Sequence, residues 1–203
     1  MKAYKNLTAA VLFALIFSVL FSFTRFESAC ADVRGSVLRL HILANSDSPE
    51  DQAIKLKVRD ALLKEGENIF GYCENLENAE KLAAKNIDFL QKIAKKAIKN
   101  EGFDYPVSVF LGKAEFGTRE YDKLTLPAGE YEAVRVIIGE GAGKNWWCVM
   151  FPPVCVPAAK AEDLSAVVGK EGEEITGNSR EYVVKFKVIE IYEAIKSKFS
   201  KEK

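Results

Sequence analysis

The sequence is poor in histidine and has no excess of either charge. His41 is the single histidine among 203 residues, and 29 Lys and Arg side chains are balanced by 29 Asp and Glu. One histidine cannot build a histidine-rich zinc site, and a Ser-His or Cys-His enzyme would have to use His41. A net charge of zero excludes a strongly basic nucleic-acid binder. Because 48% of the residues are apolar, a disordered chain is excluded as well.

The N-terminal segment lacks charge over residues 7–23. Two lysines precede this apolar run, and Ala-Cys-Ala at 29–31 fits the small-x-small rule of signal peptidase. Residues 1–31 are therefore expected to be a secretory signal peptide, followed by a single domain over 32–203. The run is also just long enough for an uncleaved membrane anchor. Both alternatives place the bulk of the protein outside the cytoplasm.

Cysteine is scarce, with four in the chain, and no C-x-x-C spacing indicates a zinc site. An exported chain tolerates disulfides. Cys148 and Cys155 enclose six residues, including Pro152-Pro153, which bend the chain so that the two sulfurs could meet. A disulfide there would contribute about 2–3 kcal/mol on the chain-entropy account. Two buried free thiols are the alternative, and Cys73 is expected to stay unpaired.

The pattern of apolar residues predicts an α+β fold: one domain with a mostly antiparallel sheet and packed helices. The glycine-rich segment 139–144 is expected to form the tip of a hairpin between the two strands that flank it. The first half of the last helix could instead be a strand. Alternation predicts strands over 37–44, 107–111, 131–138 and 146–151 with a weaker one near 115–121, and helical spacing predicts helices over 49–64, 76–99 and 184–199.

The turn after the first strand is rich in capping residues. Ser48 is a good N-cap, Pro49 suits the first helical position, and Asp51 lies in the first turn. Asp47 and its neighbours also offer oxygen ligands, but the segment does not match an EF-hand and helix capping explains it. Segment 139–144 does not match a phosphate loop either. No metal or cofactor is predicted.

Two adjacent tryptophans, Trp146 and Trp147, lie in the last predicted strand. Adjacent residues of a strand point to opposite faces, so one indole can enter the core while the other lies in a second layer, a ligand groove or a partner interface. The alternative is that a two-layer fold buries both. We take these tryptophans, with Asp47, Ser48 and Asp51, as the candidate partner-binding residues.

Two runs of residues resemble a known family. Residues 39–48, Arg-Leu-His-Ile-Leu-Ala-Asn-Ser-Asp-Ser, followed by Asp51, Gln52 and Lys55, resemble the first signature of the stage II sporulation protein R family. Residues 127–133 and 139–155, the latter containing Asn-Trp-Trp-Cys and Phe-Pro-Pro-Val-Cys, resemble the second. With the signal segment, the resemblance extends over nearly the whole chain except the last 40 residues.

The resemblance implies a non-enzymatic signalling protein of endospore-forming bacteria. Proteins of this family are made in the forespore and exported into the space between the forespore and mother-cell membranes. There they activate a membrane-embedded aspartic protease, the sporulation sigma-E factor processing peptidase, which removes the pro-sequence of sigma-E. The rival hypotheses are an exported envelope hydrolase, using His41 or a carboxylate pair, and a structural protein of the septum.

Overall fold

The computed structural model describes residues 2–121, 124–153, 161–177 and 179–201. It has an α+β fold, as the sequence predicts. The elements in chain order are α1 (Lys2–Arg34), β1 (Leu38–Leu43), α2 (Pro49–Phe70), α3 (Leu76–Asn100), β2 (Val107–Phe116), β3 (Arg119–Tyr121), β4 (Leu124–Leu126), β5 (Gly129–Ile138), β6 (Asn145–Phe151), α4 (Ala161–Gly177) and α5 (Ser179–Lys201).

Four strands form the main sheet in the order β2-β5-β1-β6. Strand β1 pairs in parallel with β5, whereas β2 with β5 and β1 with β6 pair in antiparallel fashion. Strands β3 and β4 form a separate antiparallel pair. The prediction of a mostly antiparallel sheet is therefore confirmed, with one parallel pairing at its centre.

The predicted hairpin between β5 and β6 is wrong. These strands are not neighbours, because β1 lies between them and pairs with both. Consecutive strands usually pair directly, which is why the sequence favoured a hairpin. Two strand spacings, about 10 Å, separate β5 from β6. The glycine-rich segment 139–144 crosses this gap over the end of β1, which explains its length.

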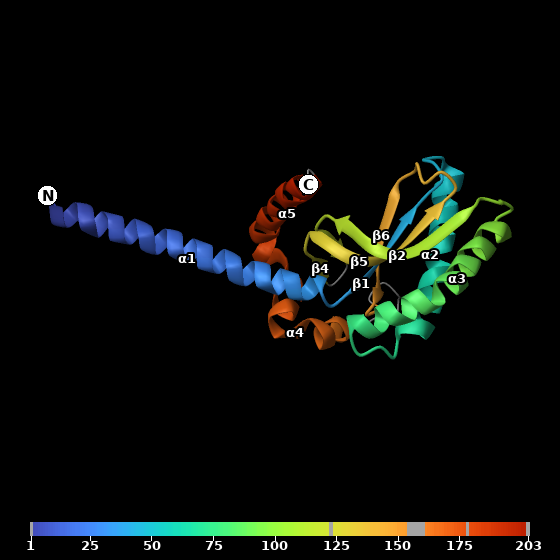
Figure 1. Cartoon of the computed structure of the whole chain (residues 1–203), viewed down its shortest axis with the longest axis horizontal. Helices are drawn as coiled ribbons and strands as arrows, with labels where there is room; N and C mark the ends of the chain where they lie inside the picture. Colours follow the sequence, from blue (N-terminus) through green and yellow to red (C-terminus); the bar gives the residue numbers. More distant parts are fainter. Residues whose placement is uncertain (1, 122–123, 154–160, 178, 202–203) are drawn as a thin grey trace.

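Helices α2 and α3 cover one face of the sheet (Figure 1). The alternation predicted for the first strand is confirmed, because Leu38, Leu40 and Ile42 point into this layer. Helix α2 begins at the predicted cap but continues to Phe70, six residues beyond the predicted end, where Gly71 follows. The buried face of α2 fixes the helix against the sheet, and its capped start therefore fixes the position of the β1–α2 turn.

The other face of the sheet carries a second core. The last turns of α1 pack there together with α4, α5 and the β3–β4 pair. Helix α4, which bends at Gly169, was not predicted. The predicted boundary after residue 31 falls inside α1, whose N-terminal part projects far from the body as a single long rod (Figure 1).

The last helix corrects a second sequence inference. Helix α5 is helical throughout its described length, so the strand alternative for its first half is wrong. The apolar stripe that its spacing selects, which includes Val184, Ile191 and Ile195, is exposed. The opposite face, with Phe186 and Ile189, packs into the second core.

Candidate partner-binding site

The β1–α2 turn is a capped helix start, as predicted. Ser48 has extended backbone dihedrals and its side chain accepts the Asp51 backbone N–H at 3.1 Å. Pro49 occupies the first helical position, where a missing N–H has no cost. Ser48 is half-buried, Asp47 is exposed, and Asp51 is buried. Of the two carboxylates among these candidates, only that of Asp47 lies at the surface.

The Asp51 carboxylate is the polar centre of this turn. Its Oδ2 accepts hydrogen bonds from Ser46 Oγ and from Asn45 Nδ2, the latter at 2.8 Å. Burial alone would raise the pKa of Asp51, but these bonds and one from Tyr105 outweigh it and lower the pKa below its usual value. Asp51 is therefore a charged group that fixes the shape of the turn from inside.

The glycine-rich segment 139–144 is fastened to this turn by backbone hydrogen bonds. Gly143 N–H donates to the Ala44 carbonyl at 2.9 Å, and Lys144 N–H donates to Asp47 Oδ1 at 2.7 Å. A Cβ on Gly143 would overlap the Ser46 carbonyl oxygen. This glycine permits close approach of two backbones, so the segment is a fitted cover rather than the hairpin tip that the sequence indicated.

A buried lysine completes the junction. Lys55 Nζ donates to Gln52 Oε1 at 2.6 Å and to the Lys144 carbonyl at 3.0 Å. Burial lowers the pKa of Lys55. The two sequence signatures, one on each side of residue 100, are thus joined into a single polar unit. Sequence spacing could not reveal this, because Lys144, which contacts both Lys55 and Asp47, is 89 positions from Lys55 and 97 from Asp47.

The two tryptophans point to opposite faces of β6, as predicted, and both are half-buried. Trp146 packs against the α2–α3 layer, with the Arg59 guanidinium carbon 4.5 Å from its ring centroid. Trp147 lies on the other face and stacks on His41, with ring centroids 3.8 Å apart. Phe116 meets Trp147 edge-on at 4.7 Å. Each indole therefore closes one layer while keeping part of its surface exposed.

His41 is held as a neutral ring inside this stack. It is 6% exposed, and its Nε2 donates to Asn145 Oδ1 at 2.7 Å. Burial lowers the pKa of His41, the neighbouring charge of Arg135 lowers it further, and the Asn145 hydrogen bond only partly opposes them. Its Nδ1 has no hydrogen-bond partner in the part of the chain that the structure describes. The contacts described for His41 are those of a packed side chain beneath Trp147.

Four side chains form a row across the sheet on the face of Trp147. The strand register places Phe110 opposite Arg135, Arg135 beside His41, and His41 opposite Trp147. The Arg135 guanidinium carbon lies 5.1 Å from the Phe110 ring centroid. Phe110 is 37% exposed, and Arg135 and Trp147 are partly exposed. We call these four residues the cross-sheet row.

Exposed aromatic rings and arginines beside each other are the side chains that protein interfaces favour. Arg119 adds a second cation at one end, 5.8 Å from the Trp147 ring centroid. Sequence reasoning found Trp147 but missed Phe110 and Arg135. The insertion of β1 between β5 and β6, which the predicted hairpin did not allow, brings them into line with it.

A fully buried arginine lies behind the cross-sheet row and was also missed. Arg39 donates from Nε to the Cys148 carbonyl at 3.0 Å and from Nη2 to the Tyr121 hydroxyl at 2.8 Å. Its guanidinium carbon is 4.1 Å from the Phe116 ring centroid and 4.8 Å from that of Tyr131. Aromatic faces stabilise a desolvated cation, which offsets part of the cost of burial. Arg39 thus ties β1 to β6 and to the β3–β4 pair.

The cysteines divide into two groups. Cys30 and Cys73 carry free thiols, as expected for Cys73. Cys148 is buried on β6. Its predicted partner, Cys155, lies outside the described residues, so the Cys148–Cys155 pairing stays a prediction.

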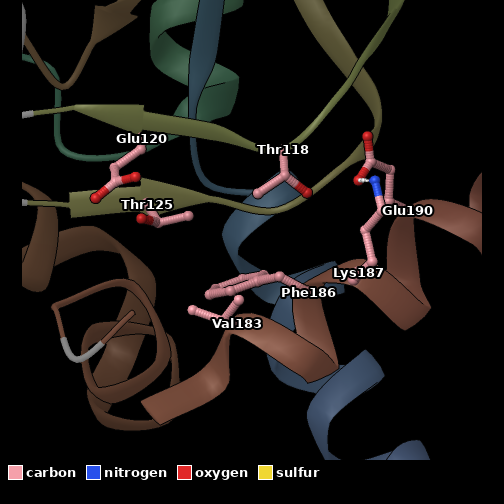
Figure 2. A pocket seen from close by; sticks show the side chains of 7 residues that line it. All are labelled: Thr118, Glu120, Thr125, Val183, Phe186, Lys187 and Glu190. Atoms are coloured by element: carbon pink, nitrogen blue, oxygen red, sulfur yellow. Dashed lines mark hydrogen bonds and ion pairs between the residues drawn. The ribbon is translucent and has the colours of Figure 1, made fainter. Parts of the chain in front are cut away.

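A groove lies between the β3–β4 pair and α5 (Figure 2). Val183 and Phe186 point from α5 toward the strand that carries Thr125. The charged groups on its α5 side, Lys187 and Glu190, are joined by an ion pair of 2.8 Å. Within the described ranges, no group of three or more His, Cys, Asp or Glu side chains is arranged to hold a metal ion. We assign no ligand to this groove.

Comparison with known proteins places the sheet, the β1–α2 turn and the glycine-rich cover in one family. The family model described as "Stage II sporulation protein R (spore_II_R)" matches residues 34–161. The chain belongs to the stage II sporulation protein R family. It is 42% identical over 118 residues to Stage II sporulation protein R of Bacillus subtilis (strain 168). That match covers 58% of this chain and 53% of the relative, about half of its length. No solved structure matches the chain.

The region matched by the stage II sporulation protein R family contains every candidate residue named above. It includes the polar unit around Asp51, the cross-sheet row and both Cys148 and Cys155. It excludes nearly all of α1 and the whole of α5. The chain is therefore a stage II sporulation protein, and its two outer helices lie outside the part that defines the family.

Proposed function

We propose that this protein is an exported signal that activates the membrane-embedded protease responsible for processing pro-sigma-E. The family assignment carries the proposal, since it makes the chain a sporulation stage II protein. The apolar N-terminal helix supports export into the space between the forespore and mother-cell membranes. Activation is a shift of the protease population toward its active state, which requires binding energy that differs between the two states.

We further propose that the cross-sheet row is the surface that meets the protease. It offers aromatic area in Phe110 and Trp147 and positive charge in Arg135 and Arg119. An acidic and apolar surface on the outer side of the protease would match it. Asp47, Ser48 and Asp51 then act indirectly, by holding the Gly139–Lys144 cover that leads into β6.

The function is tested in cells that are not sporulating. Such cells would make the protease and pro-sigma-E, and the full chain would then be induced. We expect mature sigma-E on an immunoblot only after induction. If pro-sigma-E stays unprocessed while the chain is exported and stable, the protein is not the activator. Processing without the chain would also contradict the proposal, because the protease would need no signal.

The surface is tested with two matched phenylalanines. Phe110 on β2 and Phe89 on α3 are 37% and 43% exposed, on different sides of the molecule. Phe110→Ala should reduce processing of pro-sigma-E several-fold at equal protein level, whereas Phe89→Ala should leave it unchanged. Equal processing by both variants would move the contact surface elsewhere while leaving the proposed activity intact.

A further inference from the structure

The projecting part of α1 is an exposed apolar rod. Among the described residues, the segment Asn6–Arg34 is the one helix long and apolar enough to cross a membrane, and it contains an 18-residue stretch with a mean hydropathy of 2.3. Phe13 and Phe17 are each 72% exposed, which water would penalise and hydrocarbon would not. Arg25 is the first charged residue after this run and is exposed where α1 meets the body, so it marks the level of the membrane surface.

The last turns of the same helix are part of the folded body. Phe26, Ala29, Cys30 and Val33 are buried in the second core. Arg34 donates to the Ala128 carbonyl at 3.1 Å and is paired with Glu27 at 2.6 Å. Cleavage after residue 31 would remove three of the four core side chains and Glu27. The last turns of α1 are therefore part of the folded body, and their loss would open the second core.

Helix α5 carries apolar residues on two opposite faces. Phe186 and Ile189 point into the second core. On the opposite side, five exposed side chains recur at intervals of three or four positions, which is one face of a helix. These are Val184, Val188, Ile191, Ile195 and Phe199, which we call the outer stripe. At about 100° per residue, they stay within a narrow arc along the whole helix.

The outer stripe is continuous with the exposed part of α1. A groove between the two helices is lined by Val184 and Val188 from α5 and by Val19 and Phe23 from α1. Phe23 meets Tyr192 edge-on with ring centroids 5.8 Å apart. Helix α5 lies across α1 at the base of the projecting rod (Figure 1). A membrane that α1 crosses would meet the outer stripe at its surface.

Lysines line both edges of the outer stripe. Lys185 and Lys196 lie on one flank, and Lys187 and Lys198 lie on the other, all with exposed side chains. Lys187 and Lys196 are also ion-paired with Glu190 and Glu193, so Lys185 and Lys198 carry the charge that no acidic side chain in the described part of α5 balances. An apolar stripe between two rows of lysine is the pattern of helices that lie in the interface of a bilayer, where the lysine stems reach outward to anionic headgroups. The outer stripe starts beside α1, the helix that is long and apolar enough to cross a membrane, so a lipid surface would cover both.

We propose that α1 is retained as an anchor and that α5 lies flat on the anionic surface of the membrane that α1 crosses. The domain is then held at two places, by a spanning helix and by a surface helix. This fixes its rotation about the α1 axis and so determines which face points away from the membrane. The proposal does not depend on the protease, because it concerns lipid contacts of two helices outside the matched family region.

The proposal is tested with the full chain in lipid vesicles. Vesicles would contain phosphatidylcholine and phosphatidylglycerol whose acyl chains carry bromine near the headgroups, which quenches nearby indoles. Ile195→Trp places a probe on the outer stripe, and Phe89→Trp places a matched probe on exposed α3. We expect brominated lipid to quench a larger fraction of the tryptophan fluorescence in the Ile195→Trp variant than in the native protein. The fraction quenched in the Phe89→Trp variant should be no larger than in the native protein. The unfolding midpoint checks that both variants fold.

Three results would overturn the proposal. One is an Ile195→Trp probe that is no more quenched than the native tryptophans. Another is protection of the outer stripe by a second copy, seen as a dimer in detergent that the double variant Ile191→Ser/Ile195→Ser abolishes. The third is an N-terminus at Asp32 in protein recovered from membranes, because the anchor would then be lost. An intact N-terminus supports the retention of α1 as an anchor, and selective quenching at position 195 supports the placement of α5 on the membrane surface.

Discussion

Buried polar residues on β1 set the chemistry of the sheet face. Arg39 and His41 point to the same side of the strand and are covered by Phe116, Trp147 and Tyr121. One is a cation stabilised by aromatic faces, and the other is a ring kept neutral by burial. Both exclude water from the base of the cross-sheet row. His41 has a packing role, so its protonation should affect the stability of the fold.

The neutral state of His41 predicts how stability depends on pH. Its pKa in the folded protein lies below the unfolded value of 6.5, so the unfolded chain binds the proton more readily. Stability from this group is complete above about pH 6.5 and is lost as the pH falls toward the lowered pKa. Unfolding midpoints measured from pH 7.5 to 5 should therefore fall for the native protein and fall less for His41→Gln. Parallel curves for the two proteins would contradict this account.

The close approach of the Gly139–Lys144 cover to the β1–α2 turn predicts a second residue effect. Gly143→Ala forces a methyl group against the Ser46 carbonyl and should lower the free energy of unfolding by about 1–3 kcal/mol. Gly112→Ala is the control, because a Cβ there meets nothing within 4 Å. Denaturant titration should show the control unchanged or slightly more stable. Equal effects would mean that the Ser46 carbonyl can move aside without cost, which would contradict the role of space at Gly143.

At the scale of elements, local signals were read correctly and pairing was not. Ser48-Pro49 marks the start of α2, and the apolar spacing of α3 gives its ends to within a residue, because capping and amphipathicity act over one or two turns. Strand order depends on contacts far apart in sequence, so β1 between β5 and β6 was out of reach. For the same reason, the sequence did not predict that Phe110 and Arg135 belong to the site. Trp147 was predicted because two adjacent tryptophans on a strand are themselves a local signal.

Helix α5 shows a related limit. An apolar stripe predicts burial, yet here the stripe is exposed and the less regular opposite face is buried. Sequence periodicity reports that a face avoids water, not what covers it. A lipid surface and a protein core satisfy the same pattern.

The disulfide is an element-scale prediction, because it would close the end of β6. Two of the four cysteines, Cys30 and Cys73, are free thiols. Alkylation of the unfolded chain without reductant should therefore modify two cysteines, and four after reduction. Reduction should also lower the free energy of unfolding by about 2–3 kcal/mol, and Cys155→Ser should have the same effect. Four alkylated cysteines without reductant would exclude a Cys148–Cys155 bond.

At the scale of the whole molecule, the two cores have different roles. The α2–α3 layer and the polar unit around Asp51 hold the sheet in shape. The second core joins that sheet to α1 and α5, which we place at the membrane. The cross-sheet row lies on the same side of the sheet as the second core, on strands that this core leaves partly uncovered. The proposed anchor and the proposed recognition surface therefore belong to the same folded body.

Contact between the cross-sheet row and the protease is the central claim, and site-specific photocrosslinking tests it most directly. A photoreactive amino acid would replace Phe110 in one variant and Phe89 in the other, in cells that process pro-sigma-E. We predict a crosslinked product that contains the protease from position 110 and none from position 89. A protease crosslink from position 89, or none from position 110 while processing continues, would contradict the account.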